Sequence, residues 1–143
     1  MPLVTRNHPK LTLEGARAVL AAAERRAQEI QRPMDIAVVD DGGHLLAFAR
    51  MDGAKLSSIE ISLVKARAAA VRRASTGAPP GEQPNLALAL GLAIASPAQQ
   101  TPVRGGVPLV VDGQVVGAIG VSAGTEDQDE DVARAGAAAL EKA

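Results

Sequence analysis

The chain has 143 residues, 22% of them charged, and its 15 basic and 16 acidic side chains leave a formal net charge of −1. This length suits one domain, 1–143, which buries roughly two-thirds of its unfolded surface. The near-neutral charge argues against a nucleic-acid partner, because phosphate backbones attract an excess of positive charge. The lack of cysteine excludes disulfides and thiolate metal sites, and a single aromatic residue, Phe48, excludes base-stacking platforms.

The start of the chain contains no apolar core of a signal peptide, and no apolar run is long enough to span a membrane. Both absences predict a cytoplasmic protein without a membrane partner. Residues 1–10 are predicted to form an N-terminal tail. Thr12 is a favoured N-cap, and the apolar residues between it and Pro33 recur at helical spacing, which predicts a helix that ends before the proline.

Two β-hairpins are predicted from turn residues flanked by apolar runs. The turn of the first is Asp-Asp-Gly-Gly at 40–43, and the turn of the second is Asp-Gly at 112–113. Asp-Gly between apolar runs is a strong hairpin signal, and hairpins pair antiparallel. The predicted strands are residues 36–39, 44–49, 107–111 and 115–121.

A helix over residues 57–73 carries two apolar stripes. One stripe consists of Ile59, Leu63, Ala66 and Ala70, and the other of Ile61, Val64, Ala68 and Val71. A helix with two apolar stripes has to bury two sides, one of them on its own sheet. The sequence therefore predicts a homo-oligomer that associates through the 57–73 helix.

The remaining segments complete an α+β pattern. Residues 74–84 form a Pro/Gly-rich loop, and Asn85 can cap a short helix over 86–93. Residues 125–128 form a capping box that opens a last helix, which is predicted to end near residue 141. The order helix, hairpin, two helices, hairpin, helix favours an antiparallel sheet flanked by helices over a parallel sheet.

These blocks, in this order, resemble the GlcG/HbpS-like family, which is also known as a haem-binding or haem-degrading domain. The resemblance implies a profilin-like fold, with helices on both faces of an antiparallel sheet. It also implies oligomers, and binding of haem or a related tetrapyrrole in some members. One departure is that the family commonly has Ser-Gly-Gly after the last strand, where this chain has Ser122-Ala123-Gly124. The matching segments are 11–16, 36–40, 42–43, 48–54, 58–61, 65–66, 105–109, 112–122 and 128–129.

The first candidate site residues lie at the end of the second predicted strand. Arg50 could hold a carboxylate, such as a haem propionate or a small organic acid, through a bidentate contact. The alternative is an ion pair with Asp52, Glu60 or Asp129. Met51 is a candidate ligand of haem iron.

Lys65 and Asp129 form the second group of candidates. A lysine between two apolar helix stripes needs a partner, and it either extends to the helix edge or contributes to a pocket. Asp129 lies in the acidic run 126–131, most of which suits the positive end of a helix. It matches the Gln-Asp pair of the family and could anchor Arg50 or Lys65.

Histidine and glycine supply the remaining candidates. With no Cys or Tyr, haem iron could be ligated by His8 or His44, or by Met34 or Met51. A tail histidine such as His8 is more often solvated. Glycine next to or within a strand marks close approach of either a packed helix or a ligand. The glycines in question are Gly105, Gly106, Gly117 and Gly120.

Three functions remain open at this stage. The leading hypothesis is an oligomeric haem- or tetrapyrrole-binding accessory protein, with iron ligated by His44 or His8. Its cofactor-binding residues would be His44, Arg50, Met51, Lys65, Gly105 and Gly106. The second is an enzyme of the isomerase, deaminase or hydrolase type acting on a small carboxylated metabolite, in which Arg50 holds the carboxylate and Lys65, Asp129 or Asp52 moves protons. The third is a non-catalytic structural subunit.

Overall fold

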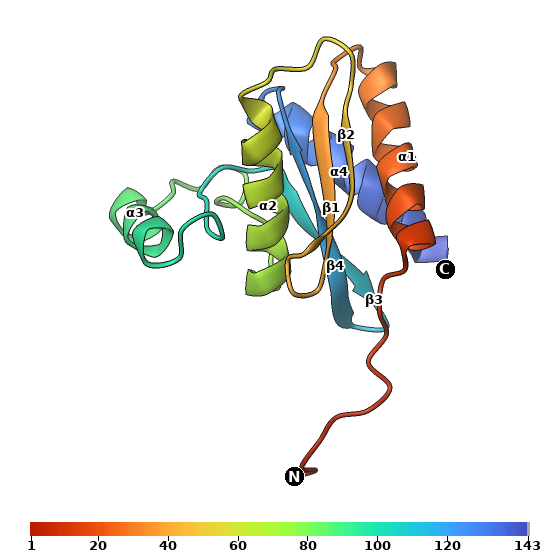
Figure 1. Ribbon diagram of the computed structural model, residues 1–143. Helices are drawn as coiled ribbons and strands as arrows, with labels where there is room; N and C mark the ends of the chain where they lie inside the picture. Colours follow the sequence, from red (N-terminus) through yellow and green to blue (C-terminus); the bar gives the residue numbers. More distant parts are fainter. Residues whose placement is uncertain (143) are drawn as a thin grey trace.

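A four-stranded antiparallel sheet in the order β2-β1-β4-β3 organises the computed structural model, which describes residues 1–142 (Figure 1). Residue 143, the last of the predicted domain, lies outside the described residues. The strands are β1 (Asp35–Asp40), β2 (Leu45–Arg50), β3 (Gly106–Val111) and β4 (Gln114–Ser122).

Both predicted hairpins are present, since β1 pairs with β2 and β3 pairs with β4. The central β1–β4 pairing, which joins the hairpins, is also antiparallel and runs from Asp35 opposite Ser122 to Asp40 opposite Gly117. The register shifts once in each hairpin, and in the β1–β2 pair the extra residue is Leu46 on the outer strand.

Helices cover both faces of the sheet, which confirms the predicted α+β fold class (Figure 1). Helix α1 (Leu13–Glu29) and helix α4 (Glu126–Ala137) pack together on one face, and α2 (Ser58–Arg72) packs on the other. The Thr12 cap and the Thr125 capping box form as predicted. The last helix becomes a 3-10 helix, η1 (Ala138–Lys142), where the sequence predicted continuous α-helix.

Helix α2 lies close to the sheet because the strands beneath it present glycine. A Cβ at Gly120 would collide with the backbone of Ser62 and Ala66, and one at Gly106 would collide with the Lys65 carbonyl. Gly106 is also tied by two hydrogen bonds to Thr76, just after α2. Gly106 and Gly120 thus allow a helix to pack closely, which is the first of the two interpretations of strand glycines; the second was the approach of a ligand.

The two apolar stripes of α2 have different environments. The first packs on the sheet, where Leu63, Ala66 and Ala70 join a cluster with residues of β1 and β4. On the second stripe Ala68 is buried, but Ile61 and Val71 remain 43% and 37% exposed. The chain itself therefore buries the first stripe of this helix, whereas the second stripe, which was also predicted to be buried, stays partly exposed.

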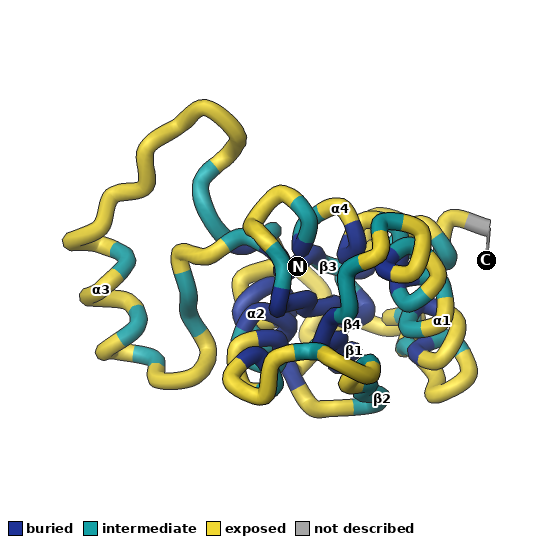
Figure 2. Tube along the Cα trace, turned by 90° about the horizontal axis from the view of Figure 1, so that it is seen from above, coloured by how far each residue is buried: buried dark blue, intermediate teal, exposed yellow. Residues whose placement is uncertain are grey.

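Helix α3 (Leu86–Ala95) stands away from the rest of the molecule on an arm that begins with the predicted loop (Figures 1 and 2). Asn85 caps it by accepting a hydrogen bond from the Leu88 N–H, and none of its residues is buried. Among the described residues, none of the helices has both the length and the apolar character needed to cross a bilayer.

The departure from Ser-Gly-Gly falls on a strained residue. Ala123 follows β4 with φ +106°, a value that favours glycine, and its carbonyl accepts hydrogen bonds from the Arg32 guanidinium. A non-glycine residue held in such a conformation costs on the order of 1–3 kcal/mol. The sequence difference thus identifies a position where glycine suits the backbone better.

We expect Ala123→Gly to stabilise the protein by about 1 kcal/mol, because the release of strain exceeds the loss of one buried methyl group. Urea denaturation of both proteins measures the change. Ala49→Gly, in the regular part of β2, is the control and should destabilise the fold by about 1 kcal/mol. Equal losses at both positions would contradict the assignment of strain to Ala123.

Candidate functional site

The Lys65 side chain is enclosed between α2, β4 and α4. Its Nζ donates hydrogen bonds of 2.9 Å to the Val121 carbonyl and 2.9 Å to Oδ2 of Asp129. The Lys65 and Asp129 side chains are only 1% and 4% exposed. Lys65 therefore does not extend to the helix edge, and of the two partners considered for Asp129 it is Lys65, not Arg50, that forms the pair.

Asp129 also fixes the turn before α4. Its Oδ1 accepts a hydrogen bond of 2.9 Å from the Gly124 N–H, so one carboxylate connects α2, the 122–125 turn and α4. A Cβ at Gly105 would lie 2.9 Å from the Lys65 Nζ. Backbone therefore closes over the ammonium group, and the pair is enclosed by the protein.

We expect Lys65→Met to destabilise the fold by about 3–5 kcal/mol, because it leaves the Asp129 charge buried without a partner. Chemical denaturation measures the loss. Adding Asp129→Asn to Lys65→Met should recover part of it, since asparagine removes the charge and can still accept from Gly124. A further loss in the double variant would contradict this account of the pair.

Asp35 is a buried carboxyl group that the sequence analysis did not single out. It opens β1 at 0% exposure, and neither carboxylate oxygen has a hydrogen-bond partner among the described residues. Its cross-strand neighbours are Arg50 and Ser122. Burial raises the pKa of Asp35, and the Arg50 charge offsets part of that rise.

The raised pKa of Asp35 makes stability depend on pH. The neutral carboxyl is favoured in the folded protein, so its contribution is complete below the ordinary value of 3.8 and is lost as the pH rises through the raised pKa. We expect Asp35→Asn to lose less unfolding free energy than the wild type between pH 4 and pH 7 in urea titrations. Parallel pH profiles for the two proteins would contradict the prediction.

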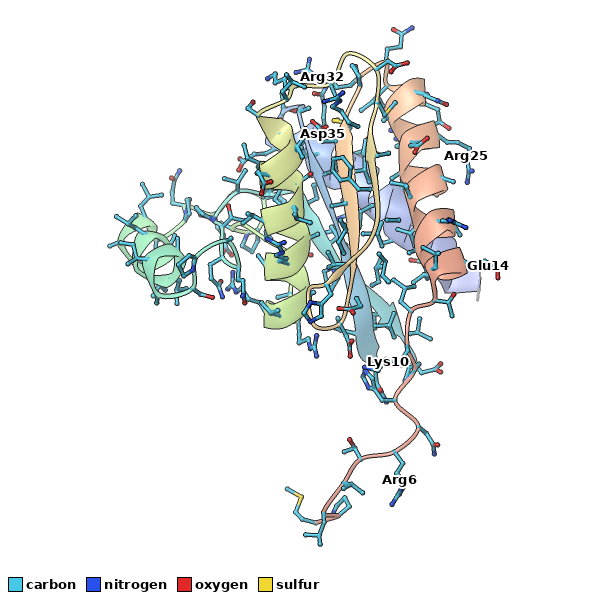
Figure 3. All side chains as sticks on the ribbon, in the orientation of Figure 1. Arg6, Lys10, Glu14, Arg25, Arg32 and Asp35 are labelled. Atoms are coloured by element: carbon cyan, nitrogen blue, oxygen red, sulfur yellow. The ribbon has the colours of Figure 1, made fainter. Side chains whose placement is uncertain are left out.

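Arg50, Met51 and Asp52 lie at the same end of the sheet as Asp35 (Figure 3 labels Asp35 and Arg32 there). They line an open cavity of about 380 Å³ together with Glu24 and Gln28 of α1. Arg50 is exposed, and within residues 1–142 it forms none of the ion pairs considered from the sequence, with Asp52, Glu60 or Asp129. Its guanidinium is available to a ligand.

Both histidines lie at the opposite end of the sheet, near the β1–β2 turn. The His44 N–H donates to the Asp40 carboxylate within the β1–β2 turn, and the Nε2 of His8 lies 3.3 Å from the Oδ2 of Asp41 in that turn. Lys10 contacts the same oxygen at 2.8 Å. The hydrogen bond from Lys10 is the main reason why the pKa of Asp41 is lowered. His8 is exposed, as expected of a tail residue, and lies beside the Asp41 carboxylate.

A second open cavity lies beside His8, at the end of the molecule where Figure 3 labels Arg6 and Lys10. It has a volume of about 530 Å³. Imidazole, guanidinium and apolar groups share its wall, and the Arg73 guanidinium also donates to the Asp41 and Ala70 carbonyls. The lining residues are Thr5, Arg6, His8, Arg73, Val110, Gly113, Gln114 and Val115.

The six residues predicted to bind a cofactor therefore fall into three places. Lys65, Gly105 and Gly106 lie in the buried pair and its surroundings, Arg50 and Met51 at one end of the sheet, and His44 at the other. The structure adds Asp35, Arg6 and Arg73. No spacing signal could have shown these, because each depends on how the tail, a strand end or the end of α2 is placed.

Residues of the acidic run 126–131 form ion pairs with arginines and help to cap helix α4. Arg104 contacts Asp127 and Glu130, and Arg26 contacts Asp131. Burial alone would raise the pKa of Glu130, but hydrogen bonds from Arg134 and Arg104 outweigh it, and the pKa is lowered. Throughout residues 1–142 no group of three His, Cys, Asp or Glu side chains is arranged to hold a metal ion.

The fold and these sites define an α+β domain with a buried ion pair between α2 and α4 and an open cavity at each end of its sheet. A family model described as haem degrading protein HbpS-like matches residues 11–138. The chain belongs to this HbpS-like family, as the resemblance in its sequence predicted.

Individual relatives agree with this membership. The chain is 43% identical to protein GlcG of Escherichia coli K12 over 112 residues, which is 78% of this chain and 81% of GlcG. The crystal structure of Klebsiella pneumoniae protein ORFY matches with a TM-score of 0.84 and 32% identity over 100% of this chain and 99% of that one. The crystal structure of a PduOC:heme complex matches with a TM-score of 0.78 and 29% identity over 92% and 95%.

Proposed function

We propose that this chain is an oligomeric, cytoplasmic protein that binds haem or a related tetrapyrrole. The observation that carries the proposal is the likeness of 92% of the chain to the PduOC chain of a haem complex. The family description names haem degradation. Binding is the step that a haem carrier and a haem-degrading protein share, so it is the function supported best.

The chain's own residues fit haem at the histidine end. Haem iron is held in proteins by His, Met, Cys or Tyr, and this chain lacks the last two. Both histidines lie at the β1–β2 turn, and Asp41 lies beside His8. A carboxylate next to a ligating imidazole orients the ring and increases its basicity.

The cavity at that end offers the other groups that a porphyrin needs. Arg6 and Arg73 can pair with propionates, and Val110 and Val115 present an apolar wall. Haem bound there would supply a redox-active iron centre. We assign His8, which lines this cavity, or His44, which lies outside its lining at the neighbouring β1–β2 turn, as the iron ligand. Arg6 and Arg73 are the propionate partners.

The opposite end fits haem less well. Met51 is a possible ligand type there and Arg50 is free, but Glu24 and Asp52 line the same cavity and would repel propionates. Lys65, Gly105 and Gly106 line neither of the two end cavities. The proposal therefore gives the binding role that was predicted for these three residues to residues of the histidine end, such as Arg6 and Arg73.

Haem titration tests the assignment. We expect hemin to bind saturably with a shift of the Soret band, and the His8→Ala/His44→Ala variant to bind at least tenfold more weakly with an altered spectrum. Met51→Leu is the matched control at the other end and should bind as the wild type does.

Two outcomes would count against the proposal. Absence of saturable hemin binding to the wild type would overturn it. A normal spectrum in the double histidine variant together with a weakened Met51→Leu variant would move the site to the Arg50 end.

The free Arg50 guanidinium favours a second candidate function, an enzyme acting on a small carboxylated metabolite. Arg50 would hold the carboxylate, and Asp52, which lines the same cavity, is placed to move a proton. Lys65 and Asp129 are held by one another away from this cavity. Protection of the wild type by small carboxylates in thermal-shift assays, lost in Arg50→Met, would support the enzyme. If neither ligand class binds, a structural subunit is the function that remains.

A further inference from the structure

A further cavity lies on the inner side of the arm that carries α3, between the point where the arm leaves α2 and the point where it returns toward β3 (Figures 1 and 2). This arm cavity is open and has a volume of about 200 Å³. Its wall is formed by the end of α2, residues 77–78 and 83–85, part of α3, and residues 100–102. It shares no lining residue with the cavities at the two ends of the sheet.

One face of α3 forms the apolar wall of the arm cavity. Leu88, Ala89 and Leu92 line it, together with Asn85, which caps the helix. These positions are three or four residues apart, the spacing that places side chains on the same face of a helix. Two prolines and an alanine from the flanking segments add further apolar groups. The cavity thus offers an apolar ligand a surface made by side chains that belong to neither core cluster.

Two polar groups distinguish this wall from an ordinary apolar surface. Arg72, the last residue of α2, is the charged residue of the lining, and within residues 1–142 it forms no ion pair. Gln100 also lines the cavity, and its Oε1 is buried without a hydrogen-bond partner among the described residues. A buried acceptor without a partner costs free energy. Because this oxygen has no hydrogen bond to lose, turning the amide toward a donor on a ligand recovers that free energy.

The volume and the charge of the cavity define the class of ligand. An apolar cavity of about 150 Å³ holds one benzene ring, and drug-sized sites begin at about 300 Å³. A cavity of about 200 Å³ therefore suits a single ring with small substituents. Arg72 attracts an anion, and its planar guanidinium matches a carboxylate. Among the described residues that line the cavity, none is acidic and would repel it.

We propose that the arm cavity binds a small carboxylic acid that carries one ring and one hydroxyl group. Arg72 pairs with the carboxylate, and Gln100 accepts a hydrogen bond from the hydroxyl group. Leu88, Ala89 and Leu92 cover the ring. This site goes beyond the proposed function and is independent of it, because a porphyrin with its four pyrrole rings is too large for the arm cavity.

Calorimetric titration of the full chain with 4-hydroxyphenylacetate tests the site. We expect saturable binding to the wild type and roughly tenfold weaker binding to Arg72→Met, which keeps an apolar side chain but removes the charge. Arg25→Met is the matched control and should bind as the wild type does. Arg25 is an exposed arginine of α1, on the side of the molecule away from α3 (Figure 3).

Two further variants test the apolar wall and the hydroxyl contact. Ala89→Phe places a ring in the cavity and should abolish binding, while the circular dichroism spectrum stays unchanged because α3 lies outside both core clusters. The wild type should prefer 4-hydroxyphenylacetate over phenylacetate by about fivefold. Gln100→Met should bind phenylacetate as the wild type does and lose that preference.

Three outcomes would overturn the inference. The first is the absence of saturable binding of 4-hydroxyphenylacetate to the wild type, and the second is wild-type binding by both Arg72→Met and Ala89→Phe. The third is loss of binding in Arg50→Met with Arg72→Met unaffected, which assigns the carboxylate to the end of the sheet. Hemin should leave the affinity for 4-hydroxyphenylacetate unchanged, so the hemin titration remains a separate test of the proposed function.

Discussion

The close approach of α2 to the sheet is the constraint on which the rest of the structure depends. It requires bare backbone at Gly106 and Gly120, because any side chain there would collide with the helix. With α2 at that distance, the Lys65 ammonium reaches past the sheet to the Val121 carbonyl and to Asp129. A polar pair so deeply enclosed gives weak net stabilisation but penalises every arrangement in which its partners are apart. It therefore fixes α2 and α4 relative to each other.

Other polar groups lie at the two ends of the sheet. One end combines Arg50 with a buried carboxyl at Asp35, and the other gathers histidines and arginines around Asp41. Each end combines arginine with carboxylates. A shared fold does not fix the ligand, which has to be argued from the side chains of a site.

Much of this fold could be predicted from the sequence because its signals are local. The Asp112-Gly113 turn, the Thr125 capping box and the Asn85 cap each act within a few residues, and each is present. The position of α3 was not predictable in this way, since an apolar helix gives no indication of where its partner lies. The buried state of Asp35 was also missed, because it follows from the strand register and not from its neighbours in sequence.

In the candidate site, too, local signals could be predicted from the sequence and long-range placement could not. Arg50 was found because it ends a strand, and Lys65 because its charge interrupts apolar stripes. The meeting of His8 with the β1–β2 turn depends on the path of the tail, which has no periodic pattern. Sequence reasoning therefore singled out individual candidate residues but could not show which of them lie together.

The outer strands restrict how copies of this chain can assemble. On β2 the extra residue at Leu46 breaks the even ladder of backbone donors and acceptors, and on β3 Pro108 lacks an N–H to offer. Neither border of the sheet is therefore suited to continuing into a neighbouring molecule as a shared β-sheet. The protein can expose the apolar helix α3 without inviting fibrous growth, because its sheet ends within the chain.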